Sequence, residues 1–182
     1  MNGSSAIPIS LPLLTLVIGG ARSGKSALAE RLVCNTRRPR VYIATAQAWD
    51  AEMRAKIAQH RLARGAEWQT VEEPRAVGPV LASRAADQVV LLDCATLWLS
   101  NHLLAGSDLA AESGGLLAAL AGCAAPVVVV SNEVGWSVVP DNALARTFRD
   151  AQGRLNQLLA AQAGLVVAVM AGLPMVLKGQ LP

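Results

Sequence analysis

The chain has 182 residues, of which 53% are hydrophobic and only 16% are charged. This balance excludes an intrinsically disordered chain, which buries too little apolar surface to fold, and the length fits one domain. The net charge is +3 and the sequence has no long block of like charges, so we expect anionic small-molecule ligands and no nucleic-acid partner.

Buried strands alternate with helices along the chain. Short, continuously apolar segments such as LLTLVIG at 13–19 are typical of buried strands, and apolar residues at helical spacing behind Asp141 predict a long amphipathic helix. In chain order we expect a flexible leader at 1–12, strands at 13–19, 41–45, 68–73, 89–93, 126–131 and 165–170, and helices at 25–34, 50–64, 76–86, 96–122 with a break near Gly106, and from the N-cap Asp141 to about Gln162.

This order of elements predicts an α/β fold. Strands that are apolar throughout need helices on both faces, which indicates a three-layer sandwich around a mostly parallel sheet. We expect residues 13–182 to form one nucleotide-binding domain, with its ligands at the carboxyl ends of the strands.

The segment after the first strand matches the phosphate-binding pattern G-x-x-x-x-G-K-[ST]. Its residues are Gly19, Gly20, Ala21, Arg22, Ser23, Gly24, Lys25 and Ser26. Backbone N–H groups of such a loop point at phosphate oxygens, the lysine reaches the β and γ phosphates, and the serine hydroxyl binds Mg²⁺. Because a strand precedes the loop and a helix follows it, we predict a P-loop NTPase-like domain.

A magnesium site usually includes an acidic residue at the tip of a second strand. Asp93 ends VVLLD and is the natural candidate, although an aspartate there could instead cap the following helix. Glu133, just past PVVVVS, could serve similarly or be an exposed turn residue. Glu72 and Glu73 are adjacent, so on a strand their side chains point to opposite faces and one could turn toward a ligand.

Only two histidines, His60 and His102, are available for imidazole chemistry. His60 lies one helical turn from Lys56 and Arg64, and cations favour the neutral, nucleophilic imidazole. The spacing alone, however, favours a basic surface of a helix over a catalytic role. His102 has no comparable neighbours and is expected to be structural.

Several segments together resemble the bifunctional adenosylcobinamide kinase / adenosylcobinamide-phosphate guanylyltransferase family of cobalamin biosynthesis. The segments occur in order: GGARSGKS at 19–26, YIATAQ at 42–47, DAEMRAKIAQHRLARGAEW at 50–68, TVEEP at 70–74, LLDCATLWLSN at 91–101 and SNEVGWSVVPDNALARTFRDAQGRLNQ at 131–157.

The resemblance implies two reactions. ATP or GTP phosphorylates adenosylcobinamide, and GMP then passes from GTP to that phosphate through a histidine–GMP intermediate, giving adenosylcobinamide-GDP and pyrophosphate. It implies that His60 is the nucleophile and that the enzyme is a trimer, while the loop pattern and the end of VVLLD already predict that Mg²⁺ is bound by Ser26 and Asp93. Besides the phosphate loop, it implies nucleotide contacts from Ala44, Thr45, Ala46, Arg61, Leu62, Ala63, Arg64, Glu72 and Asp93.

Two other functions fit the phosphate loop. One is a kinase of another small metabolite, and the other is a nucleotide-sensing module without turnover; a covalent GMP adduct separates both from the bifunctional enzyme. Three cysteines far apart in sequence predict a reducing compartment, and no apolar segment reaches the length of a membrane span, so we expect a cytoplasmic protein.

Overall fold

A computed structural model describes residues 8–47, 65 and 67–182 of the chain. Its centre is a seven-stranded sheet in the order β3-β2-β4-β5-β1-β6-β7. The strands are β1 (Leu14–Gly19), β2 (Arg40–Ala44), β3 (Trp68–Glu72), β4 (Val89–Asp93), β5 (Val127–Asn132), β6 (Leu165–Met170) and β7 (Leu173–Lys178). Every neighbouring pair is parallel except β6 and β7.

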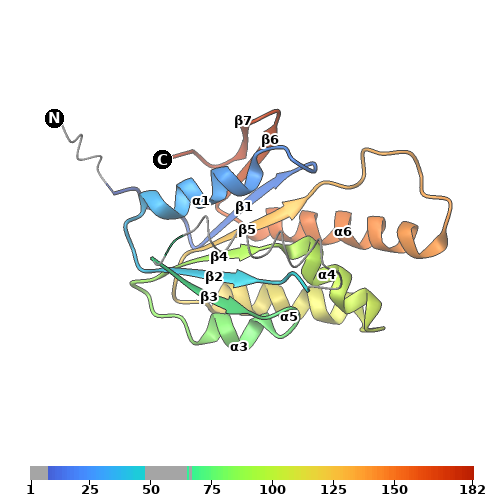
Figure 1. The fold of residues 1–182 in the computed structure, drawn as a ribbon, viewed down its shortest axis with the longest axis horizontal. Helices are drawn as coiled ribbons and strands as arrows, with labels where there is room; N and C mark the ends of the chain where they lie inside the picture. The colour runs from blue at the N-terminus through green and yellow to red at the C-terminus, as the bar shows by residue number, and fades with distance from the viewer. Residues whose placement is uncertain (1–7, 48–64, 66) are drawn as a thin grey trace.

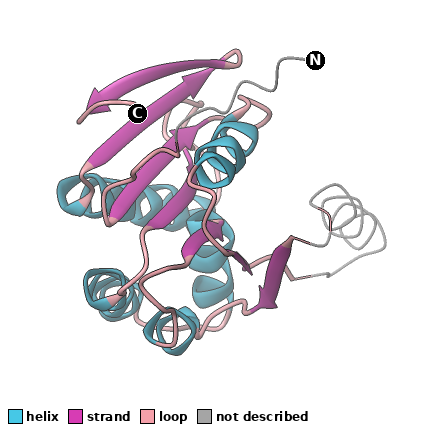
Figure 2. Ribbon diagram, turned by 90° about the vertical axis from the view of Figure 1, so that its left-hand side faces the viewer, coloured by secondary structure: helices cyan, strands magenta, loops and turns pink. Residues whose placement is uncertain are grey.

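Helices cover both faces of this sheet, as predicted. The described helices are α1 (Lys25–Asn35), α3 (Val77–Ala82), α4 (Ala95–Leu104), α5 (Leu109–Gly122) and α6 (Ala143–Gln162). Figure 1 shows α1 on one side of the sheet and the other four on the opposite side, and Figure 2 shows the layers from another direction. The predicted three-layer α/β sandwich is therefore confirmed.

Two apolar clusters fill the spaces between the layers. Under α1, Leu28, Leu32 and Val33 pack against the side chains of β1, β4 and β5 that point toward this helix. On the other face, Trp98, Leu99, Leu116 and Leu155 pack with the alternate residues of the same strands, among them Leu92 and Val129. Because each strand carries apolar residues on both faces, the strand segments read as continuous apolar runs.

The N-terminal residues that the structure describes pack on the domain. The backbone N–H of Ile9 donates to the Asn35 carbonyl at 3.1 Å, and Leu11 is buried in the cluster under α1. The expected flexible leader at 1–12 is thus wrong for this part, because two apolar side chains lie next to the end of α1. Residues 1–7 and the predicted helix at 50–64 lie outside the described residues.

Other differences are local. The helix predicted at 76–86 ends at Ala82, where the side chains of Ser83 and Arg84 both donate to the Val80 carbonyl. The break near Gly106 is confirmed: α4 and α5 are separate helices, and Gly106 has φ of +70°. The strand β7 was not predicted. Among the described helices none is long and apolar enough to cross a membrane.

Candidate active site at the phosphate loop

The phosphate loop connects β1 to α1, as the sequence predicts. Two of its glycines are required by their surroundings. A Cβ on Gly19 would lie 2.5 Å from the Val169 carbonyl oxygen and 2.6 Å from Ser23 Oγ, and Gly24 has φ of +96°. Arg22 also has positive φ, at +56°. Alternation of such conformations turns successive N–H groups toward one point, which forms a concave anion site.

Two polar side chains of the loop face inward. Lys25 is buried, and its Nζ donates to the Gly20 carbonyl at 3.1 Å, which holds the ammonium over the loop. Ser23 Oγ is buried without a hydrogen-bond partner among the described residues. The N-terminus of α1, capped by Gly24 without a side-chain hydrogen bond, adds its partial positive charge to the same place.

The turn of the β6–β7 hairpin supports the loop from the side. The N–H of Gly172 donates to the Ser23 carbonyl at 2.8 Å, and a Cβ on Gly24 would lie 3.2 Å from the Gly172 Cα. The loop therefore rests on a segment that follows the last parallel strand.

The other predicted residues that the structure describes lie at the carboxyl ends of neighbouring strands. In the sheet register Ala44 on β2 pairs with Glu72 on β3 and with Asp93 on β4. The parallel register brings these ends to the same edge of the sheet as Gly19, so the predicted segments lie along one edge. His60, Arg61, Leu62, Ala63 and Arg64 lie outside the described residues.

Asp93 is oriented by a phenol. Its Oδ2 accepts a hydrogen bond from the Tyr42 hydroxyl at 2.5 Å. The alternative role of Asp93 as a helix cap is wrong, because the N-cap of α4 is Cys94, whose sulfur accepts from the Leu97 N–H at 3.5 Å. Its carboxylate therefore stands at the end of β4 without serving the helix.

Burial and two charged residues of the site affect the pKa of the Cys94 thiol. Burial raises the pKa of this thiol to about 11, the Asp93 carboxylate contributes to the rise, and the Lys25 ammonium opposes it. Both charges act on this thiol, and α1 packs against β4.

Thr45 locks the ends of β2 and β4 together. Its hydroxyl donates to the Cys94 carbonyl and accepts from the Cys94 N–H, both at 2.8 Å. Its carbonyl accepts from Asn101 Nδ2, which also donates to the Pro74 carbonyl. Thr45 thus has its polar groups engaged within the protein, and it positions Ala44, Ala46 and Asp93. Asn101 was not singled out from the sequence, since nothing in LWLSN distinguishes it from an exposed helix residue.

The two adjacent glutamates differ in role. Glu73 Oε1 accepts from the N–H groups of Arg75 and Ala76, at 3.0 and 2.8 Å, and so stabilises the turn before α3. Glu72 ends β3 at the edge where the strand ends meet. Glu73 thus serves the turn and Glu72 lies at the strand end, which is compatible with the expectation that only one of the pair faces the site.

A buried polar network fixes the end of β5 beside the phosphate loop. Ser131 Oγ donates to Asn156 Oδ1 at 2.6 Å, and Gln152 Nε2 donates to both. The Asn132 N–H donates to Thr96 Oγ1 at 2.7 Å. Since Asn132 pairs with Gly19 in the sheet, this network ties α4 and α6 to the first residue of the loop. Polar residues spaced four apart on the predicted helix, Gln152 and Asn156, were the available signal.

His102 is structural, as expected. Its ring is buried and packs edge-on against Trp98, with ring centroids 4.6 Å apart. Nδ1 lies 3.2 Å from Ser107 Oγ and Nε2 lies 3.4 Å from the Arg75 carbonyl. With the proton on Nε2, both nitrogens are satisfied.

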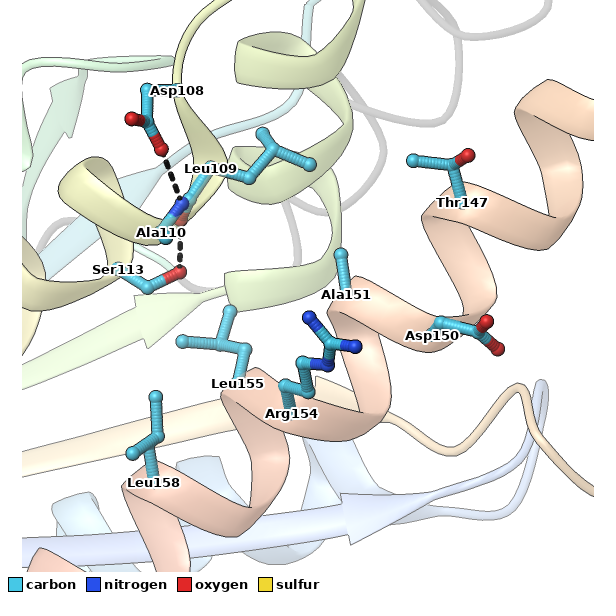
Figure 3. Close-up of a pocket in the computed structure, with 10 residues that line it drawn as sticks. All are labelled: Asp108, Leu109, Ala110, Ser113, Thr147, Asp150, Ala151, Arg154, Leu155 and Leu158. Carbon is cyan, nitrogen blue, oxygen red and sulfur yellow. Dashed lines mark hydrogen bonds between the residues drawn. The ribbon is translucent and has the colours of Figure 1, made fainter.

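The described residues line several surface cavities, among them two of more than 400 Å³. One, of about 410 Å³, adjoins the phosphate loop and Glu133. The other, of about 490 Å³, lies between α5 and α6 and is drawn in Figure 3, where the side chains of Leu155 and Arg154 project from α6. None of the residues lining this second cavity belongs to the predicted site.

With this geometry established, comparison with known proteins decides the family. The family model described as "Cobinamide kinase / cobinamide phosphate guanyltransferase" matches residues 15–177. The chain belongs to this family. A relative in Pseudomonas aeruginosa named "Bifunctional adenosylcobalamin biosynthesis protein CobP" is 47% identical over 91% of this chain and 97% of its own length. In Salmonella typhimurium a protein named "Bifunctional adenosylcobalamin biosynthesis protein CobU" is 43% identical over 91% of this chain and its whole length.

Solved structures support the fold alone. The RadB recombinase superposes with a TM-score of 0.53 at 18% identity, over 87% of this chain and 74% of that one. This likeness confirms the P-loop NTPase-like arrangement of sheet and helices.

Proposed function

We propose that this member of the cobinamide kinase / cobinamide phosphate guanyltransferase family catalyses both reactions on one phosphate loop. It phosphorylates adenosylcobinamide with ATP or GTP, and then transfers GMP from GTP to adenosylcobinamide phosphate through a GMP adduct of His60. The observation that carries the proposal is that the phosphate loop with Lys25 and Ser26 and the β4 end with Asp93 share the carboxyl edge of the sheet, in a chain that matches the family over 15–177.

The phosphate loop serves both steps. Its N–H groups and the Lys25 ammonium bind the triphosphate and neutralise the charge that develops on the leaving group. Phosphoryl transfer to a hydroxyl needs mainly this positioning, so the kinase step proceeds without a covalent intermediate.

The residues present fit Mg²⁺. Ser26 offers a hydroxyl and Asp93 a carboxylate, which are the hard oxygen ligands that this ion prefers. Among the described residues no group of three His, Cys, Asp or Glu side chains could form a closed metal cage, and Mg²⁺ usually takes only one or two protein ligands beside phosphates and water. When bound there, the ion would neutralise phosphate charge. Tyr42 keeps the Asp93 carboxylate in place for it.

His60 supplies the nucleophile for guanylyl transfer. A neutral ring nitrogen attacks the α-phosphorus of GTP, a P–N bond forms, and the P–O bond to pyrophosphate breaks. The phosphate of adenosylcobinamide phosphate then attacks the same phosphorus and releases the imidazole. Splitting the transfer into two displacements lowers each barrier. Arg61 and Arg64 clamp phosphate oxygens as bidentate donors, while Ala44, Ala46 and Glu72 contact the nucleoside.

The test is incubation with GTP labelled at the α-phosphate and Mg²⁺, followed by peptide mapping. The label should be found on the peptide containing His60. The His60→Ala variant should form no adduct and transfer no GMP, yet still phosphorylate adenosylcobinamide, whereas His102→Ala should retain the adduct. A label on another residue, or an adduct in the His60→Ala protein, would contradict the proposal.

We also propose that the protein acts as a homotrimer in the cytoplasm on small-molecule substrates, with residues 13–182 as one catalytic domain. The small net positive charge suits anionic substrates, and the family match over 15–177 supports a single catalytic domain.

A further inference from the structure

The cavity beside the phosphate loop has walls of two kinds. One wall is the loop itself from Gly19 to Ser23, together with Glu133. The opposite wall is apolar and largely exposed: Trp136, Met170, Met175 and Leu177 have exposed fractions of 80, 52, 51 and 60%. The cavity therefore places an open apolar surface directly against the groups that bind phosphate.

The cavity and the proposed nucleotide contacts outside the loop lie on opposite flanks of the loop. In the sheet, β4, β2 and β3 lie on one side of β1, and they carry Asp93, Ala44 and Glu72 at their ends. The apolar wall comes from β6, β7 and the turn between them, on the other side of β1, and from Trp136 in the connection after β5. A nucleotide that extends from the loop toward β4, β2 and β3 leaves this cavity to a second substrate.

Glu133 is held at the boundary between the loop and the cavity. Its backbone N–H donates to the Gly19 carbonyl at 3.1 Å, and its Oε1 accepts from the Gly135 N–H at 2.7 Å. The side chain is half-buried, and it is the acidic group among the lining residues that the structure describes. Two hydrogen bonds thus fix a carboxylate next to the first residue of the phosphate loop.

We propose that this cavity receives the acceptor alcohol of the kinase step and that Glu133 is the catalytic base for it. The apolar wall suits an alcohol carried on a large organic body, and the loop places the γ-phosphate beside its hydroxyl. The inference rests on the proposed function, whose kinase step needs such an acceptor site.

The step balances without a further reactant. The acceptor O–H bond breaks, and its proton passes to Glu133 Oε2. The acceptor oxygen bonds to the γ-phosphorus while the bond from that phosphorus to the bridging oxygen breaks, and the nucleoside diphosphate leaves with that electron pair. Glu133 then releases the proton to water.

The Glu133→Gln variant tests the base. The amide oxygen still accepts from the Gly135 N–H, so the turn is retained, but the base is lost. The kinase kcat should fall by about 10²–10⁴-fold, while the GMP adduct forms at the wild-type rate because that half-reaction involves no acceptor. Asp141→Asn, the same change at an exposed position of the same connection, should leave the kinase kcat unchanged.

The Trp136→Ala variant tests the cavity. The KM for adenosylcobinamide should rise about tenfold or more through lost apolar contact, with the KM for ATP unchanged. Val138→Ala, a truncation of another exposed apolar residue in the same connection, is the matched control.

Three results would overturn the inference: a kinase kcat of Glu133→Gln near that of the wild type, an equal loss of kinase activity and adduct in that variant, or a rise in the KM for ATP instead of the acceptor in Trp136→Ala. A wild-type protein that neither phosphorylates adenosylcobinamide nor forms the adduct would instead contradict the proposed function itself.

Discussion

At the scale of single residues, neighbouring residues at the end of β4 have separate structural roles. Cys94 caps α4, Thr45 fastens the two strands, and Tyr42 holds Asp93. Because the helix and the strand ends are satisfied by other groups, the Asp93 carboxylate can be directed at a cation without cost to the fold. Tyr42 is the only tyrosine of the chain, and its phenol is the group that orients this carboxylate.

The Asp93→Asn variant should need much more Mg²⁺ and lose activity by orders of magnitude. Asparagine keeps the size and can still accept from Tyr42, but it loses the negative charge that attracts the ion. A magnesium titration of both reactions measures this. Asp87→Asn, at an exposed position before β4, serves as the control, and a titration curve for Asp93→Asn that overlays the wild type would refute a metal-binding role.

The three cysteines should differ in reactivity. Burial raises the pKa of the Cys94 and Cys123 thiols, to about 11 for Cys94, whereas Cys34 is partly exposed. Since the thiolate is the reactive form, a thiol reagent at pH 8 should label Cys34 in the native protein and the other two only after unfolding. Mass spectrometry of labelled peptides checks this, and rapid native labelling of Cys94 would contradict it.

The same shift makes stability depend on pH. The Cys94 pKa in the folded chain exceeds the ordinary value of 9.0, so its contribution to stability is complete below pH 9. As the pH rises from 9 toward 11, the unfolded thiol ionises while the folded one does not, and the free energy of unfolding should fall.

At the scale of elements, the sequence does not determine which of two adjacent residues caps the start of α6. Asp141 and Asn142 are adjacent and cap helices comparably well. In the structure the cap is Asn142, whose Oδ1 accepts from the Ala145 N–H at 2.8 Å, and the prediction of Asp141 is wrong by one position. Arg146 donates to the carbonyls of Pro140 and Asp141, which fixes the turn so that Asn142 stands at the cap.

Asn142→Ala should therefore reduce the free energy of unfolding by about 1 kcal/mol, through loss of the cap. Asp141→Ala, at an exposed neighbour, should change it by less than about 0.5 kcal/mol. Urea unfolding of the two variants distinguishes the positions. The reverse order of effects would show that the carboxylate caps the helix.

Most elements could be predicted because their burial is uniform. The strands β1, β2, β4, β5 and β6 are apolar on both faces, and α6 carries an apolar stripe, so a local residue pattern identifies each of them. The strand β7 could not be identified, since Pro174 lacks a backbone donor and the strand is exposed along its length. The order of the strands, which places β1 between β5 and β6, depends on crossovers that no local pattern records.

The sequence motif predicts the residues of the candidate site but not the hydrogen bonds that position them. Lys25, Ser26 and Asp93 follow from the loop pattern and from strand ends. The supporting hydrogen bonds, from Tyr42 to Asp93 and from Asn101 to Thr45, join residues far apart in sequence, and no spacing rule links such pairs. The same holds for Glu133, whose position beside the loop follows from the pairing of β5 with β1.

At the scale of the whole molecule, the edge strand β7 carries exposed apolar side chains. Two of them, Leu173 and Val176, lie outside the cavity wall described above. An apolar edge strand is a template for association, which agrees with the proposed trimer.

The native mass should be three times the chain mass of 18.9 kDa. Light scattering coupled to gel filtration measures it. Leu173→Lys, which adds a charge to the exposed edge, should shift the mass toward that of the monomer, whereas Leu104→Lys, at an exposed position on α4, should not. A monomeric wild type would contradict the proposed trimer.

The hydrogen bond from the Gly172 N–H to the Ser23 carbonyl bears on how deletion experiments should be interpreted. A chain truncated after β6 would lack no residue that we assign to the nucleotide, yet its phosphate loop would lose the support of the hairpin turn. Loss of GTP binding in such a truncation would therefore reflect a phosphate loop that has lost its support. It would not identify a nucleotide contact in the C-terminal residues. Conversely, a molecule that binds the outside of the β6–β7 hairpin could displace Gly172 and, through its hydrogen bond, Ser23 of the loop. Inhibitors could therefore act at the hairpin without entering the nucleotide site.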